Sequence, residues 1–178
     1  MKDISLFTID GPDLYPFTPE REPISIETIA LGLSNTCRYG GQVRHFYSVA
    51  QHSVIVSEMV SPEFALWGLL HDAAETWIGD IPAPLRDGMC WQFDGVLYGI
   101  DAVERQILNH VADTFGLEPG IPQEVHEADM EIRIREQRSW YVCGKNRWWR
   151  DGLTEPWRPG VTHDIFLDRF ENLTKTET

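Results

Sequence analysis

The segment LWGLLHDAAETWIGD at residues 66–80 constrains the fold more than any other, because it predicts a helix without a solvent-facing side. Its apolar residues fall on nearly every side of a helical wheel, and a helix of that kind lies in the middle of a domain. The preceding Ser61-Pro62-Glu63 is typical of a capped helix start, and Gly79 suits a left-handed exit. The segment therefore predicts one long buried helix that ends at Gly79.

Three titratable residues lie on this apolar helix. Glu75 follows His71 by four residues and Asp72 by three, so in an α-helix the three side chains share a patch about one turn tall. A charged group on a buried helix needs a partner or a metal ion. The alternative is a solvated helix face, which the apolar neighbours disfavour.

The rest of the chain predicts an all-α domain with a loop-rich N-terminal segment. Residues 1–24 contain many turn formers, with one alternating stretch around Leu6, and favour loops or a hairpin. Hydrophobic periodicity and capping residues then predict further helices. They begin after Ser25, after Ser48, at about residue 95 and near Pro122, and the last covers residues 162–173.

Two further polar residues occupy core-facing positions of these helices. His52 lies on the apolar face of the helix after Ser48, and Asp129 lies between Val125 and Ile132 on the inner face of the helix after Pro122. Either alone is more often a hydrogen-bonded core residue. Together with His71 and Asp72 they would form a nitrogen and oxygen site for Mn, Fe, Co or Zn. The spacing alone leaves both interpretations open.

Composition narrows the partners. The 178 residues fit a single domain, and 28 acidic against 15 basic residues give a net charge of -13, which disfavours long nucleic acids. A small phosphorylated ligand remains compatible if a cation and arginines reverse the field locally. The start of the sequence does not resemble a signal peptide and no apolar run is long enough for a bilayer. Three widely spaced cysteines fit a reducing compartment, so we expect a cytoplasmic protein without a membrane partner.

The order His52, His71-Asp72, Asp129 resembles the signature of the HD-domain metal-dependent phosphohydrolases. The stretches HFYSVAQHS, LLHDAAETWIGDIPAPL and EADMEIRIREQR resemble the bacterial and phage branch that contains 5′-deoxynucleotidases and phage deoxynucleoside triphosphohydrolases. The similarity covers about residues 25–140. It implies a compact HD-domain helical bundle and a homo-oligomer.

The resemblance also implies roles for single residues. The metal ligands would be His52, His71, Asp72 and Asp129, binding a divalent transition metal (Mn, Co, Zn or Fe). Asp72 and Glu75 would be the catalytic residues, with Glu75 handling the proton.

Four more residues would bind the substrate. Arg38 would hold the phosphate, for which a planar guanidinium is suited, and Asp80 would lie near the sugar. Tyr39 stands where several relatives have tryptophan, which leaves its part in sugar discrimination open. Pro84 would stiffen the loop beside the base, although a rigid helix exit explains it equally well.

The predicted function is cleavage of the bond between the α-phosphorus and the 5′ oxygen of a deoxynucleoside monophosphate. A phage-type triphosphohydrolase that acts on deoxynucleoside triphosphates such as dATP is the alternative, and a non-catalytic nucleotide-binding regulator is an alternative of another class. In this interpretation one domain spans 1–178, with a lead-in at 1–24, an HD core at 25–140 and an aromatic-rich segment and closing helix at 141–178. The tryptophan-rich residues 139–157 fit a lid, an oligomer contact or a base-stacking platform.

Overall fold

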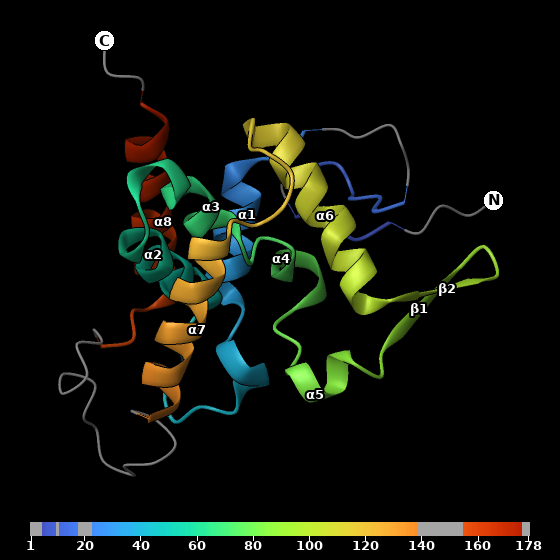
Figure 1. The fold of residues 1–178 in the computed structure, drawn as a ribbon, viewed down its shortest axis with the longest axis horizontal. Coiled ribbons are helices and arrows are strands. Elements are labelled where there is room, and N and C mark those ends of the chain that lie inside the picture. The colour runs from blue at the N-terminus through green and yellow to red at the C-terminus, as the bar shows by residue number, and fades with distance from the viewer. Residues whose placement is uncertain (1–4, 10, 18–22, 139–154, 176–178) are drawn as a thin grey trace.

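The computed structural model describes residues 5–9, 11–17, 23–138 and 155–175. Helices make up most of these residues, as predicted, and they pack around one another (Figure 1). The longer helices are α1 (Ile26–Asn35), α2 (Val49–Met59), α3 (Ala65–Leu70), α6 (Ile100–Phe115), α7 (Gln123–Gln137) and α8 (Pro159–Thr174). The shorter elements are η1 (Arg38–Gly41), η2 (Pro62–Phe64), α4 (Glu75–Ile78), α5 (Ala83–Arg86), β1 (Cys90–Phe93) and β2 (Val96–Gly99).

Helix α2 is central and packs against α1, α3, α7 and α8. The approach of α3 is close because Gly68 faces the backbone of α2, where a Cβ atom on Gly68 would lie 2.8 Å from the Cα of Ser57. The main hydrophobic core joins α1, α2, α3, α6 and α8, and a second cluster lies between α2, α3, α6 and α7. Most of α2 is buried as a result, including His52.

The two helix starts that the sequence predicts after Ser25 and Ser48 are confirmed. Ser25 and Ser48 cap α1 and α2, since their hydroxyls accept hydrogen bonds from the backbone N–H of Thr28 and Gln51, each at 3.1 Å. Gly116 ends α6 in the left-handed conformation, with φ of 66°. The helix that carries His52 therefore begins where the sequence predicts.

The predicted continuous helix up to Gly79 is wrong. Helix α3 ends at Leu70 and α4 begins at Glu75, with a turn between them in which the N–H of Ala73 bonds to the carbonyl of Leu70. The N–H of Glu75 likewise bonds to the carbonyl of Asp72, again three residues back. Tighter winding aligns side chains three residues apart, and the charge of Asp72 acts on Glu75.

Ser61 does not cap a helix through its side chain, contrary to the prediction. Its backbone N–H and its hydroxyl both donate to Oε1 of Glu124, at 2.6 and 2.7 Å. The carboxylate of a residue near the start of α7 thus attracts both donors of Ser61.

The all-α prediction is also corrected at residues 90–99, where β1 and β2 form an antiparallel hairpin that projects from the helices (Figure 1). The turn residues Asp94 and Gly95 have φ of 48° and 78°. An Asp-Gly pair between alternating apolar residues is a strong hairpin signal, and it outweighs the helical pattern predicted from residue 95.

Among the described residues of the N-terminal lead-in, an antiparallel bridge joins Leu6 and Leu14. Of the tryptophan-rich segment, residues 139–154 lie outside the described residues. Within the described ranges, no helix combines the length and the apolar character that a bilayer crossing requires.

Candidate functional site

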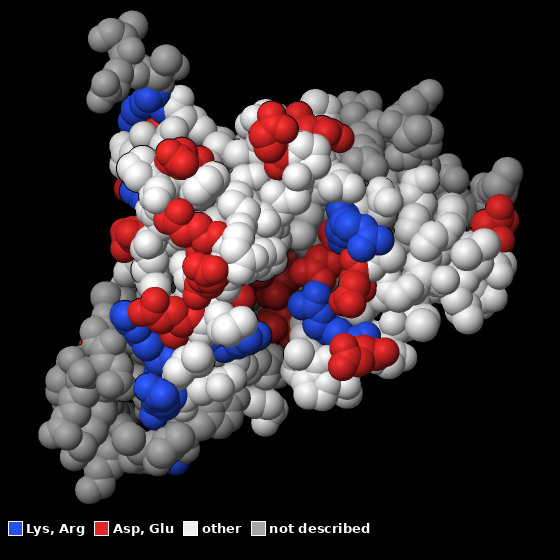
Figure 2. Space-filling model, viewed as in Figure 1, with Lys and Arg blue, Asp and Glu red and all other residues white. Residues whose placement is uncertain are grey.

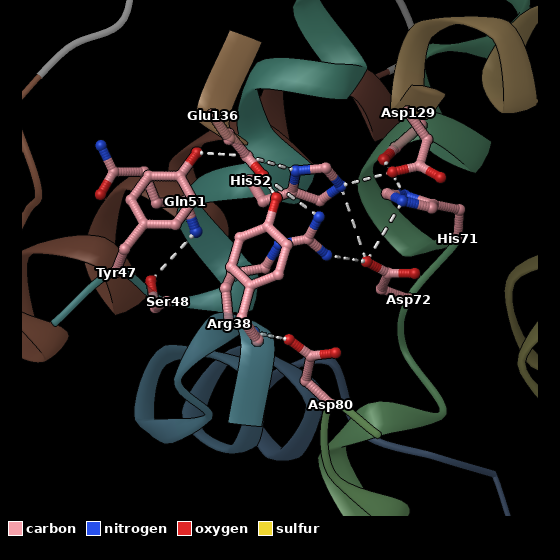
Figure 3. Close-up of polar contacts among 12 residues, drawn as sticks. Arg38, Tyr47, Ser48, Gln51, His52, His71, Asp72, Asp80, Asp129 and Glu136 are labelled. Atoms are coloured by element: carbon pink, nitrogen blue, oxygen red, sulfur yellow. Dashed lines mark hydrogen bonds and ion pairs between the residues drawn. The ribbon is translucent and has the colours of Figure 1, made fainter. Parts of the chain in front are cut away.

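Three of the four predicted metal ligands form a close cluster. One ligand atom from each of His52, His71 and Asp72 lies within 4.8 Å of the other two. Oδ2 of Asp72 is 3.7 Å from Nε2 of His52 and 3.3 Å from Nε2 of His71. Figure 3 shows the two imidazoles and the carboxylate converging from α2 and from the turn after α3. The structure therefore brings together three residues that the sequence analysis names as metal ligands.

Asp129, the fourth predicted ligand, reaches the cluster from α7. Its Oδ1 lies 3.1 Å from Nε2 of His52, on the side of that ring that faces the cluster (Figure 3). Burial opposes ionisation of Asp129, but His52 outweighs it and lowers the pKa of the carboxyl. Four nitrogen and oxygen donors from three parts of the chain thus face one another.

The outer nitrogens of both histidines are held by neighbouring acceptors. Nδ1 of His52 lies 2.9 Å from Oε1 of Glu136, and Nδ1 of His71 lies 2.8 Å from the carbonyl oxygen of Gly68. An acceptor at Nδ1 favours the tautomer whose Nε2 carries a lone pair. Both Nε2 atoms are buried and face carboxylate oxygens of Asp72 and Asp129. This donor set fits a divalent transition metal, since ligating histidines commonly have such an acceptor behind them.

The electrostatics also favour a cation between these groups. Burial and Arg38 act to lower the pKa of His52, yet Glu136 and Asp129 outweigh them and raise it to about 9. Burial acts to raise the pKa of Asp72, but the neighbouring His71 and His52 hold it well below its ordinary value. The carboxylates that favour a proton on His52 would favour a metal ion in its place, because metal and proton compete for the same nitrogen.

Arg38 lies at the margin of the metal-ligand candidates and is buried. Its Nη1 donates to Oδ2 of Asp72 at 3.2 Å and its Nη2 donates to Oε2 of Glu136 at 3.3 Å. Burial acts to lower the pKa of Arg38, but Glu136 and Asp72 raise it, so the guanidinium is charged. A fixed cation thus adjoins the ligand cluster, as phosphate binding requires.

Tyr39 and Asp80, two predicted substrate residues, contact each other. The backbone N–H of Tyr39, a residue with φ of 58°, donates to Oδ2 of Asp80. The hydroxyl of Tyr39 donates to Oε2 of Glu136 at 2.6 Å, which turns the ring toward Arg38. Asp80 follows Gly79, whose φ of 75° ends α4.

Glu75 is buried on α4, and among the described residues its Oε2 has no hydrogen-bond partner. Burial raises the pKa of its carboxyl well above the usual range, and the negative charges of Asp72 and Asp80 raise it further. Pro84 differs from the other predicted site residues because it is exposed, at the second position of α5.

Glu136 is the residue that the sequence prediction missed. It is 0% exposed and its carboxylate contacts Arg38, Tyr39, Tyr47 and His52. A signal for it exists in the sequence, because Glu136 continues the inner face of α7 seven residues after Asp129.

One face of the molecule is hollowed. Figure 2 shows acidic side chains deep in a depression near the middle of this face, with basic side chains at its margins. A separate pocket of about 370 Å³ is lined by residues 45–46 and 155–159 and includes none of the predicted ligands. The ligand cluster and this pocket are distinct features.

The chain is similar to two curated proteins. It is 34% identical over 176 residues to an uncharacterized protein of Escherichia coli K12, YfdR, with 94% of each chain covered. It is 36% identical over 87 residues to an uncharacterized protein of Rhodobacter capsulatus, with 44% of each chain covered. No family model matches the chain.

Proposed function

This chain belongs to the same family as the Escherichia coli protein YfdR. We propose that it is a metal-dependent phosphohydrolase of the HD-domain type. Its substrate is a 5′-deoxynucleoside monophosphate, which it cleaves between the α-phosphorus and the 5′ oxygen. The observation that carries the proposal is the convergence of His52, His71 and Asp72 within 4.8 Å, with Asp129 beside His52 and Arg38 beside Asp72.

His52, His71, Asp72 and Asp129 would hold the metal. When bound, a divalent cation lowers the pKa of water and offsets negative charge on the transferring phosphoryl group. Arg38 binds phosphate oxygens and orients the phosphorus. Glu75 handles the proton that moves from the attacking water to the departing 5′ oxygen, a role that suits a buried carboxyl whose pKa is raised.

Among the described residues, the charges that act on Asp72 and Glu75 favour a monophosphate over a triphosphate. Two additional phosphates would need more fixed positive charge near the site. Arg86 is the second arginine whose charge acts on Glu75, but its guanidinium already forms ion pairs with Glu104 and Asp101. The triphosphohydrolase is therefore the second candidate. The homo-oligomer and the cytoplasmic location remain predictions.

The test is a product assay. Protein stripped with EDTA is reloaded with Mn, Co or Zn and incubated with each deoxynucleoside mono- and triphosphate, and the products are separated by chromatography. Nucleoside and phosphate from monophosphates are the expected products, whereas nucleoside and tripolyphosphate would establish the second candidate. Nucleotide-induced thermal stabilisation without any product would replace the enzyme with a nucleotide-binding regulator.

A further inference from the structure

Glu136 is fully buried and lies against both parts of the candidate site. Figure 3 shows its carboxylate between the imidazole of His52 and the guanidinium of Arg38. A buried carboxylate without partners is costly, yet this one has four. The partners are Nδ1 of His52, the hydroxyl of Tyr47, Nη2 of Arg38 and the hydroxyl of Tyr39.

The two oxygens of Glu136 divide these partners by function. Oε1 lies 2.9 Å from both Nδ1 of His52 and the Tyr47 hydroxyl. Oε2 lies 3.3 Å from Nη2 of Arg38 and 2.6 Å from the Tyr39 hydroxyl. One oxygen therefore faces a metal-ligand candidate and the other faces the phosphate-binding candidate.

We propose that Glu136 is a positioning residue that orients His52 toward the metal and Arg38 toward the substrate phosphate at the same time. The inference rests on the proposed function, because it assigns Glu136 to the same site. Oε1 accepts the Nδ1 proton of His52 and leaves Nε2 free to ligate. Oε2 fixes one arm of the Arg38 guanidinium, so the planar group keeps one orientation.

The substitution Glu136→Gln exposes this double role, because an amide cannot replace both oxygens. An amide has an acceptor at one end and a donor group at the other. If the NH₂ group faces His52, it favours the wrong tautomer for metal binding. If it faces Arg38, two donor groups oppose each other and the guanidinium moves. In either orientation, His52 or Arg38 loses its acceptor. The other residue is held less firmly, because the negative charge of Glu136 that acted on both is gone.

The experiment measures binding rather than turnover alone. Mn²⁺ affinity is determined by competition with a chromophoric chelator, and affinity for inorganic phosphate is determined at saturating Mn²⁺. Glu131→Gln is the matched control, since Glu131 lies exposed on the same helix and pairs with Arg135. We expect Glu136→Gln to weaken Mn²⁺ binding and phosphate binding at least tenfold each, and Glu131→Gln to change each by less than twofold.

The possible results distinguish a failure of the proposed function from a failure of the inference about Glu136. Wild-type protein that binds no divalent metal would overturn the proposed function together with this inference. Wild-type protein that binds metal, beside a folded Glu136→Gln variant with unchanged affinities, would overturn the inference alone. In the Glu136→Gln variant, a loss of Mn²⁺ affinity without any loss of phosphate affinity would also reject the double role.

Tyr47→Phe gives a second route if Glu136→Gln does not fold. It keeps a buried ring and removes one donor from Oε1, the oxygen that holds His52. We expect Mn²⁺ affinity to fall at least threefold and phosphate affinity to change by less than twofold. Equal affinities in the Tyr47→Phe variant and the wild type would overturn the proposal.

Discussion

The site contains two buried glutamates in opposite electrostatic conditions. On the α7 side, burial acts to raise the pKa of Glu136, but His52 and Arg38 outweigh it and lower the value to about 2. On the α4 side, burial raises the pKa of Glu75 well above its usual range, and the negative charges of Asp72 and Asp80 act in the same direction. Both carboxyl groups are almost equally hidden from solvent.

The difference teaches that neighbours, rather than burial, decide what a buried carboxyl group can do. Glu136 has four partners and behaves as a fixed anion that supports other groups. Glu75 has acidic neighbours and, among the described residues, an oxygen without a hydrogen-bond partner, so its carboxyl group keeps a proton to a higher pH than an ordinary glutamate does. The α7 side is thus suited to positioning and the α4 side to proton transfer.

We expect the largest effect on the free energy of unfolding. Glu136→Ala removes the anion that holds Arg38 and His52, and we expect the free energy of unfolding to fall by about 3–5 kcal/mol. Glu75→Ala removes a carboxyl group with acidic neighbours, and we expect a change of about 1 kcal/mol or less because removing the cost of burying this acidic group offsets the lost packing. Urea unfolding of both variants checks the comparison. Equal losses in the two variants would show that the two glutamates do not differ as described.

The pH dependence of stability sharpens the same contrast. Because the folded-state pKa of Glu136 is about 2 and its ordinary value is 4.5, its stabilising contribution is present above about pH 4.5 and is lost as the pH falls toward 2. That contribution is about 3 kcal/mol at neutral pH. Glu75 acts in the opposite sense, since its raised pKa means that stability falls as the pH rises above the ordinary value.

Urea unfolding of metal-stripped protein at several pH values tests this. Stability of Glu136→Gln should decline less between pH 5 and pH 3 than that of the wild type, whereas Glu75→Gln should flatten the decline that starts above about pH 4.5. Parallel curves for the wild type and the Glu136→Gln variant would contradict the assignment of a fixed anion.

In turnover, unlike in stability, we expect a large effect from Glu75. Glu75→Gln keeps the size of the side chain but cannot transfer a proton, so we expect kcat to fall about 100-fold or more with Mn²⁺ affinity unchanged. The measurement is steady-state phosphate release together with chelator competition, and Glu131→Gln serves as the control. Turnover within a few-fold of the wild type would remove Glu75 from the proton-handling role.

Much of the α7 and α2 geometry could be predicted from sequence, because it follows helical periodicity. Asp129 occupies an apolar position of a regular helix, and His52 follows a serine cap, so their inward direction is encoded locally. Glu136 obeys the same periodicity, but its partners come from residues 38–52, and no local pattern identifies a long-range partner.

The α4 side was harder to predict because tertiary packing changes its local structure. The break between Leu70 and Glu75 follows a tighter winding that the apolar pattern does not reveal. The hairpin at 90–99 had a local signal in Asp94-Gly95, but its apolar residues also fit the start of the following helix. Short apolar segments are ambiguous in this way until the turn residues are weighed.

The α4 side of the site is positioned by the close approach of α3 to α2, which Gly68 allows. In Gly68→Ala the new methyl group would meet the Ser57 backbone at 2.8 Å, and a backbone cannot rotate away as a side chain can. We expect the free energy of unfolding to fall by about 2 kcal/mol and Mn²⁺ affinity to weaken, because His71 follows three residues later. Gly160→Ala, which meets nothing within 4 Å in α8, is the control and should not destabilise the protein.

The smallest expected effect comes from the cap of α2, the helix that presents His52 to Glu136. The hydroxyl of Ser48 accepts from the N–H of Gln51, so Ser48→Ala should lower the free energy of unfolding by about 1 kcal/mol. Ser25→Ala removes an equivalent cap from α1 and should cost about the same. Thermal unfolding measures both losses, and chelator competition separates them. Only Ser48→Ala should also weaken Mn²⁺ binding, because the first turn of α2 sets the direction of the His52 ring. Equal Mn²⁺ affinities in the two variants would mean that Glu136 alone orients that ring and that the start of α2 contributes stability without positioning.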